Sequence, residues 1–120
     1  MYHVLTVDDS RTMREMLAQT LRTAGFRVSS AKDGAAALAL AQAEHFALVI
    51  TDINMPELDG LGLIRALRDL PDYRHTPILT LTTEDSPAHR QAGRAAGATG
   101  WMVKPFDPER LIATLGRLLP

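Results

Sequence analysis

Charged and hydroxyl side chains follow short apolar runs at several separate points of this 120-residue sequence. Asp8 and Asp9 come directly after the first run, and Asp52 follows a run that is almost wholly apolar. Thr82 and Lys104 stand at the ends of two later runs. Each of these residues alone is most simply a solvated loop or turn residue. Gathered at one place, however, the three carboxylates would repel one another strongly unless positive charge lay among them.

A hard divalent cation together with a lysine ammonium would supply that positive charge. Oxygen ligands in a chain without cysteine or paired histidines favour Mg²⁺ over zinc, with Mn²⁺ as the alternative. An aspartate beside such a cation, opposite a lysine and a hydroxyl, can accept a phosphoryl group. Asp52 is the candidate nucleophile because it stands alone after the most apolar run, whereas the adjacent Asp8 and Asp9 suit metal binding.

The elements that would bring these residues together alternate along the chain. Short β-rich runs are expected at 2–7, 26–30, 47–51, 77–81 and 100–103, and each is followed by apolar residues at helical spacing. Five strand–helix units are too few for a closed eight-unit barrel, so they predict an α/β fold with an open, doubly wound parallel sheet. Ligands bind such sheets beyond the carboxyl ends of the strands, where the polar residues described above fall.

Local signals mark the ends of the expected helices. Gly25 and Gly97 predict left-handed caps, while Asp33, Ser86 and Asp107 predict N-caps. The helix after Ser86 should be the least firmly docked, since its expected apolar face consists mostly of small residues. These residues are Ala88, Ala92, Ala95 and Ala96.

Composition and charge exclude several classes of protein. With 46% hydrophobic residues, the chain can form one core, and we expect a single domain over residues 1–120 without an output domain. A formal net charge of -1 gives the chain no excess of basic residues with which to bind nucleic acid or an anionic membrane. The N-terminus lacks a basic region followed by a long apolar run, and no apolar run is long enough to span a bilayer, so a cytoplasmic protein is expected. We also expect a monomer.

Four motifs together resemble those of a known family. They are VDDSRTMR at 7–14, TDINMPELDG at 51–60, LTTED at 81–85 and GATGWMVKPF at 97–106. In this order and spacing they are similar to the receiver domains of two-component response regulators, and among these to the free-standing chemotaxis regulators of the CheY type. The resemblance covers the whole chain and implies a flavodoxin-like (βα)5 fold with strand order 2-1-3-4-5.

The resemblance implies a metal and phosphoryl site at the same residues. Asp52 would be the phosphoacceptor and would also contact Mg²⁺, which Asp9 would bind directly and Asp8 through water. The backbone carbonyl of Asn54 would complete the metal site. Lys104 would pair with the Asp52 carboxylate and then with the phosphoryl group, and its peptide bond to Pro105 would be cis.

The resemblance also implies a switch. Thr82 would donate its hydroxyl to the phosphoryl group, and Trp101 stands where the family usually has a tyrosine or phenylalanine that then swings inward. Because an indole is larger than a phenol, the pocket must be roomier or the swing incomplete. Thr83, commonly alanine or glycine in the family, would restrict access to Asp52. Asn54 and Glu84 flank the site as in short-lived chemotaxis regulators, which predicts a phosphoryl lifetime of seconds to minutes.

The expected function is therefore a signalling switch that catalyses only its own phosphorylation and dephosphorylation. A chemotaxis-type histidine kinase would phosphorylate it. The surface of the fourth helix, fifth strand and fifth helix would then bind a partner such as the flagellar motor switch protein, with a phosphatase as a further partner. A phosphate sink for a shared kinase is the alternative within this class.

Two functions from other classes are disfavoured. A Mg²⁺-dependent phosphohydrolase of the dehalogenase type would have a second aspartate where this chain has Asn54. A docking module that is never phosphorylated usually loses an acidic residue or the lysine, and here all of them are present.

Overall fold

The structure is a computed structural model that describes residues 1–120. Five parallel strands form one sheet in the order β2-β1-β3-β4-β5, so the predicted fold class and the implied strand order are confirmed. The strands are β1 (His3–Val7), β2 (Arg27–Ala31), β3 (Leu48–Thr51), β4 (Ile78–Thr82) and β5 (Gly100–Val103). The helices are α1 (Arg11–Thr23), α2 (Gly34–Ala43), α3 (Gly60–Arg68), α4 (Pro87–Ala96) and α5 (Pro108–Leu118), with a short 3₁₀ helix η1 (Pro71–Tyr73) before β4.

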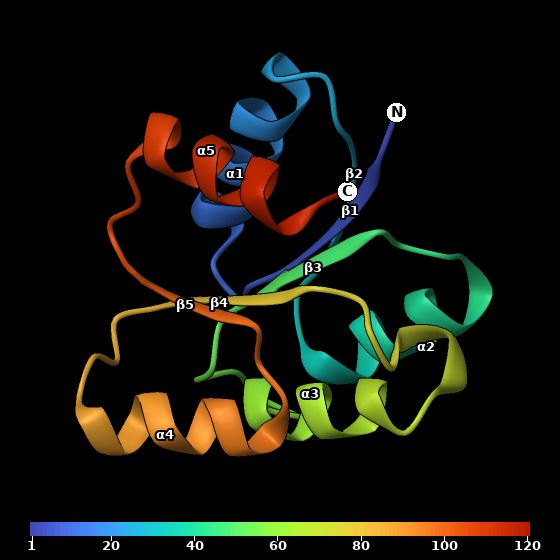
Figure 1. The fold of residues 1–120 in the computed structure, drawn as a ribbon, viewed down its shortest axis with the longest axis vertical. Coiled ribbons are helices and arrows are strands. Elements are labelled where there is room, and N and C mark those ends of the chain that lie inside the picture. The colour runs from blue at the N-terminus through green and yellow to red at the C-terminus, as the bar shows by residue number, and fades with distance from the viewer.

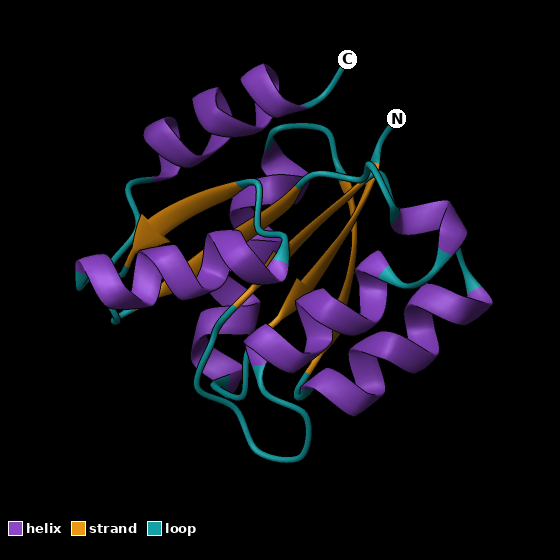
Figure 2. Ribbon diagram, turned by 60° about the horizontal axis from the view of Figure 1, so that its bottom comes forward, coloured by secondary structure: helices purple, strands orange, loops and turns teal.

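The sheet is covered on both faces. Helices α1 and α5 lie on one face, and α2, α3 and α4 lie on the other (Figure 1), so that the strands form the middle layer (Figure 2). Successive residues of a strand point to opposite faces, and Val4 and Leu5 of β1 therefore belong to two different core clusters. Every residue of β3 is buried, as expected for a strand covered on both sides.

The helix ends follow the sequence signals with one exception. Asp33 accepts a hydrogen bond from the Ala36 N–H at 2.7 Å, and Ser86 accepts one from the His89 N–H at 3.1 Å. Gly25 and Gly97 have φ angles of 96° and 117°, in the left-handed region that favours glycine. Asp107 occupies the N-cap position of α5, but its side chain makes no capping hydrogen bond.

The buried face of α4 differs from the predicted alanine face. Only Gly93 and Ala96 are buried, whereas Ala88 and Ala95 are exposed. A Cβ atom at Gly93 would lie 2.5 Å from Cζ3 of Trp101, so the indole occupies the space in which a larger residue would pack. Helix α4 thus contacts the sheet through a narrow stripe of small residues. Because such residues bury little apolar surface, α4 should be weakly docked.

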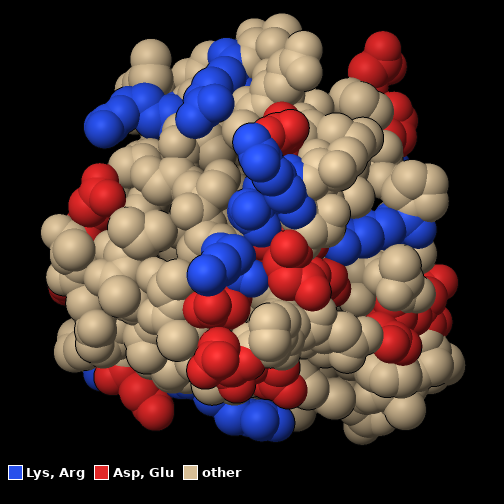
Figure 3. All heavy atoms as spheres, turned by 180° about the vertical axis from the view of Figure 1, so that it is seen from behind, with Lys and Arg blue, Asp and Glu red and all other residues tan.

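The surface carries charges of both signs. Figure 3 shows basic and acidic side chains interspersed over the rear face, without a continuous basic area of the kind that follows a nucleic-acid backbone. No helix is long and apolar enough to cross a membrane.

Candidate functional site

Two buried aspartates share one lysine at the carboxyl edge of the sheet. Lys104 Nζ lies 2.7 Å from Asp8 Oδ2 and 2.9 Å from Asp52 Oδ2. The second oxygen of each aspartate is held by the backbone, since Asp8 Oδ1 accepts the Ser10 N–H at 2.9 Å and Asp52 Oδ1 accepts the Ile53 N–H at 2.6 Å. Asp8 and Asp52 are only 1% and 8% exposed. The site is therefore organised around three charged side chains, of which the two carboxylates are poorly accessible to water.

Backbone hydrogen bonds explain why these side chains are held in place. The N–H of Asp8 donates to Ala31 O at 3.1 Å, and the N–H of Asp52 donates to Val7 O at 2.9 Å. The N–H of Lys104 donates to Thr82 O at 2.9 Å. Each bond extends a pair of strands by one residue, so the reactive side chains begin where the sheet ends, as the strand-end argument predicts.

Asp9 completes an acidic cluster with Asp8 and Asp52. Carboxylate oxygens of the three residues lie within 4.8 Å of one another, and Asp9 is the exposed member. One ammonium among three carboxylates leaves negative charge uncompensated, so the residues fit a hard divalent cation that binds oxygen ligands. Burial alone would lower the pKa of Lys104, but its hydrogen bonds to Asp8 and Asp52 outweigh this effect and raise that pKa above its ordinary value.

The hydroxyl of Thr82 is fully buried at the end of β4. Its Oγ1 accepts the N–H of Glu84 at 3.3 Å, which leaves the hydroxyl proton free to be donated. Trp101 Nε1 donates to the Glu84 carbonyl at 2.9 Å, and the half-buried indole lies against Gly93. Trp101 is thereby hydrogen-bonded to the loop between β4 and α4, which begins after Thr82. Thr83 is exposed beside them.

Asn54 and Glu84, two further residues that the sequence predicts for the site, contact each other. Asn54 Nδ2, two residues after Asp52, donates to Glu84 Oε1 at 2.8 Å. This bond joins the loop after β3 to the loop after β4. The peptide bond between Lys104 and Pro105 is cis, as the resemblance implies.

Sequence reasoning overlooked two side chains near the site. Arg14 Nη1 donates to the Asp8 carbonyl at 2.8 Å. The position of Arg14, one turn after the Ser10 N-cap, is the sequence signal that could have indicated this contact. His89 Nε2 lies 3.4 Å from Glu84 Oε2.

These features have a counterpart in known proteins. Residues 4–116 match the model of the response regulator receiver domain. The chain belongs to this family and is a receiver domain of a two-component response regulator, whose phosphodonor class is the histidine kinase. Receiver domains bind a divalent cation in an acidic site, and the carboxyl edge of this sheet carries a cluster of three aspartates.

The similar proteins include a curated response regulator and two solved structures. Response regulator MprA of Mycolicibacterium vanbaalenii is 43% identical over 97% of this chain and 49% of that protein, so the chain spans about half the length of the curated relatives it matches. The structure of chemotaxis protein CheY4 of Vibrio cholerae is 51% identical over 99% of both chains, with a TM-score of 0.96. A receiver domain of the Pseudomonas aeruginosa sensor kinase PA1611, described with magnesium coordinated in its active-site cleft, is 28% identical over 98% of this chain and 96% of that chain, with a TM-score of 0.91.

Proposed function

We propose that the protein is a switch turned on by phosphorylation of Asp52. The observation that carries this proposal is the placement of Asp52, nearly buried, paired with Lys104 and clustered with Asp8 and Asp9. A carboxylate oxygen of Asp52 forms a bond to phosphorus while the bond from phosphorus to the kinase histidine nitrogen breaks. The electron pair of the broken bond stays on that nitrogen.

The surrounding residues stabilise the charge that develops on the phosphoryl oxygens. Lys104 moves its ion pair from the carboxylate to a phosphoryl oxygen, and Thr82 donates its free hydroxyl proton to another. A Mg²⁺ ion held by Asp8, Asp9, Asp52 and the Asn54 carbonyl supplies further charge neutralisation when bound, and Mn²⁺ has the same ligand preference.

Trp101 then transmits the conformational change from the phosphorylation site to the protein surface. Because Thr82 and Trp101 both contact Glu84, a shift of Thr82 toward the phosphoryl group changes the loop that carries the indole contact. Trp101 in turn packs against α4, which is attached through a narrow stripe. The surface of α4, β5 and α5 is thus the proposed output, and the protein turns over no substrate other than its own phosphoryl group.

Chemotaxis is the pathway that we propose for this switch. The support is the 51% identity to the chemotaxis protein CheY4 over 99% of both chains, which exceeds the 43% identity to MprA over about half of that protein. The proposed partners are a chemotaxis-type histidine kinase, the flagellar motor switch protein and a phosphatase.

Acetyl phosphate with Mg²⁺ tests the phosphoacceptor. Intact-mass measurement should show the gain of one phosphoryl group in the wild type and in the Asp72→Asn control, whose altered residue is exposed on η1. The gain should vanish in Asp52→Asn. An unchanged gain in Asp52→Asn, or none in the wild type, contradicts the assignment.

Binding of the motor switch protein tests the pathway. The protein activated with beryllofluoride should bind the purified motor switch protein more tightly than the unmodified protein does. Equal or absent binding, combined with rapid phosphoryl transfer from the chemotaxis kinase, would instead identify a phosphate sink.

A further inference from the structure

A chain of side-chain contacts runs from the edge of the phosphorylation site to the first turn of α4. Asn54 Nδ2 donates to Glu84 Oε1 at 2.8 Å. The other carboxylate oxygen, Glu84 Oε2, lies 3.4 Å from His89 Nε2. His89 Nδ1 lies 2.5 Å from Ser86 Oγ, at the N-cap of α4. His89 is therefore held at both ring nitrogens although the residue is exposed.

The contacts of His89 accommodate the tautomer that carries its hydrogen on Nε2. Ser86 Oγ already accepts the backbone N–H of His89 at 3.1 Å, so its own proton is available to be donated to His89 Nδ1. A neutral imidazole that accepts at Nδ1 carries its hydrogen on Nε2, and this hydrogen faces the Glu84 carboxylate. The Ser86 N-cap of α4 thus holds the His89 ring in an orientation in which Nε2 faces the Glu84 carboxylate.

Glu84 is held from four directions. Its N–H contacts Thr82 Oγ1, its carbonyl accepts from Trp101 Nε1, and its carboxylate lies between Asn54 and His89. A carboxylate offers about four lone-pair positions, so two remain for water. The bond between Asn54 and Glu84 joins the loop that follows Asp52 to the loop after β4, and so ties this water-binding group to a residue two positions from the phosphoacceptor.

We propose that His89 is a positioning residue for hydrolysis of the phosphoryl group on Asp52, a proposal that rests on the proposed function. In this step a water oxygen forms a bond to phosphorus while the bond from phosphorus to the Asp52 oxygen breaks. The electron pair returns to the Asp52 carboxylate, and the water proton leaves with the phosphate or to solvent. Glu84 and Asn54 orient the water, and His89 acts by holding Glu84.

Hydrolysis of the preformed aspartyl phosphate tests the proposal. The protein is phosphorylated with acetyl phosphate and Mg²⁺, the donor is removed, and the remaining phosphoprotein is followed by intact mass. His89→Ala should lengthen the half-life about three- to ten-fold, because a loosened Glu84 orients water less often. His89→Gln should restore a half-life near that of the wild type, since its amide can still donate to Glu84. His75→Ala, an exposed histidine elsewhere, is the matched control and should leave the half-life unchanged.

A double-variant comparison separates positioning from a general structural effect. If His89 acts through Glu84, then Glu84→Ala and the Glu84→Ala/His89→Ala double variant should have the same half-life. Multiplicative effects of the two substitutions would overturn the proposal, as would an unchanged or shortened half-life in His89→Ala. These outcomes leave Asp52 as the acceptor, whereas a wild type that gains no phosphoryl group refutes the proposed function and this inference with it.

Discussion

At the scale of single residues, the site depends on one ammonium placed between two buried carboxylates. Asp8 and Asp52 are nearly inaccessible to water, and a carboxylate in such a place is costly unless it is paired and hydrogen-bonded. Lys104 contacts both, and backbone N–H groups hold their remaining oxygens. The lysine that we propose as a phosphoryl-binding residue should therefore also stabilise the folded protein.

Replacement of Lys104 by methionine should reveal this stabilisation and its dependence on pH. At pH 7 the substitution should lower the free energy of unfolding by about 3 kcal/mol, because two buried carboxylates lose their partner. The pKa of Lys104 is raised in the folded protein above an ordinary value of about 10.4. The contribution of Lys104 to the free energy of unfolding is thus fully present below about pH 10.4. It is lost as the pH rises through the pKa that Lys104 has in the folded protein.

Urea unfolding of both proteins between pH 7 and pH 11 measures the effect. The difference between wild type and Lys104→Met should stay constant up to about pH 10 and then shrink. The comparison also cancels the ionisation of Tyr73, whose pKa burial raises in both proteins. A difference that remains constant to pH 11 would contradict the role assigned to the ion pair.

At the scale of elements, one arginine adds hydrogen bonds to the apolar packing that holds α3 against its neighbours. The guanidinium of Arg68 donates to the Gly97 carbonyl at 3.0 and 2.8 Å, and to the carbonyls of Tyr73 and Thr76 at 2.6 and 2.7 Å. Burial lowers the pKa of Arg68, but the group stays charged at any ordinary pH. The side chain thus joins the end of α3, the segment after η1 and the end of α4.

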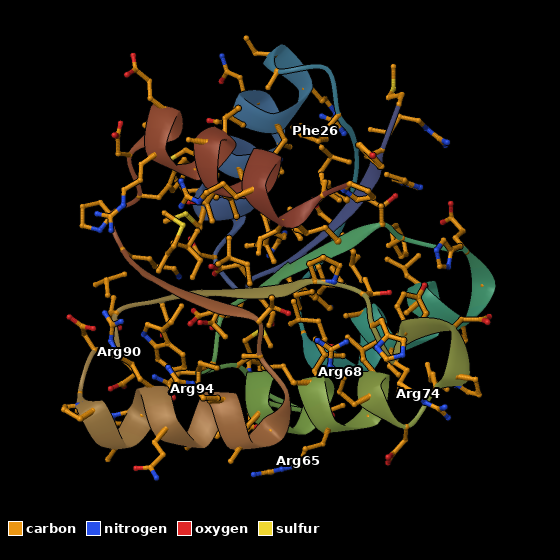
Figure 4. The ribbon with its side chains drawn as sticks, in the orientation of Figure 1. Phe26, Arg65, Arg68, Arg74, Arg90 and Arg94 are labelled. Carbon is orange, nitrogen blue, oxygen red and sulfur yellow. The ribbon has the colours of Figure 1, made fainter.

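Arg68→Met should lower the free energy of unfolding by about 2–3 kcal/mol, because half-buried carbonyls lose charge-assisted hydrogen bonds. Arg65, one turn earlier on the same helix, extends away from the body whereas Arg68 turns inward (Figure 4). Arg65→Met should therefore change the free energy of unfolding by less than about 0.5 kcal/mol. Chemical denaturation of the two variants checks the contrast, and equal losses would show that Arg68 has no special role.

These elements also show how far the sequence predicts the structure. Strand positions and the sheet-edge location of Asp52 follow from periodicity, because a buried parallel strand needs a continuous apolar run. The buried face of α4 does not follow. Its rotation is decided by the indole of Trp101 against Gly93, a contact between distant parts of the chain. The missing capping hydrogen bond of Asp107 and the contact of Arg14 with the Asp8 carbonyl depend on similar three-dimensional details.

At the scale of the whole molecule, the site and the chain termini lie at opposite edges of the sheet. All strands are parallel, so the carboxyl edge that holds Asp8 and Asp52 is opposite the edge at which β1 begins. At that far edge the Tyr2 hydroxyl donates to the Pro120 carbonyl at 2.6 Å, which holds the two ends of the chain together (Figure 1). The acidic cluster is thus assembled from the ends of β1 and β3, two strands that are distant in the sequence and adjacent in the sheet.

Cation binding should therefore stabilise the molecule as a whole. The unfolded chain cannot hold Asp8, Asp9 and Asp52 together, so Mg²⁺ binds the folded state preferentially. At a concentration ten times the dissociation constant, Mg²⁺ should raise the free energy of unfolding by about 1.4 kcal/mol, and a chelator should reverse the gain. Asp9→Asn, a change at the exposed ligand, should abolish most of this gain, whereas Asp72→Asn should retain it. If denaturation midpoints with and without Mg²⁺ coincide in the wild type, or if Asp9→Asn keeps the full gain, the acidic cluster is not the cation site.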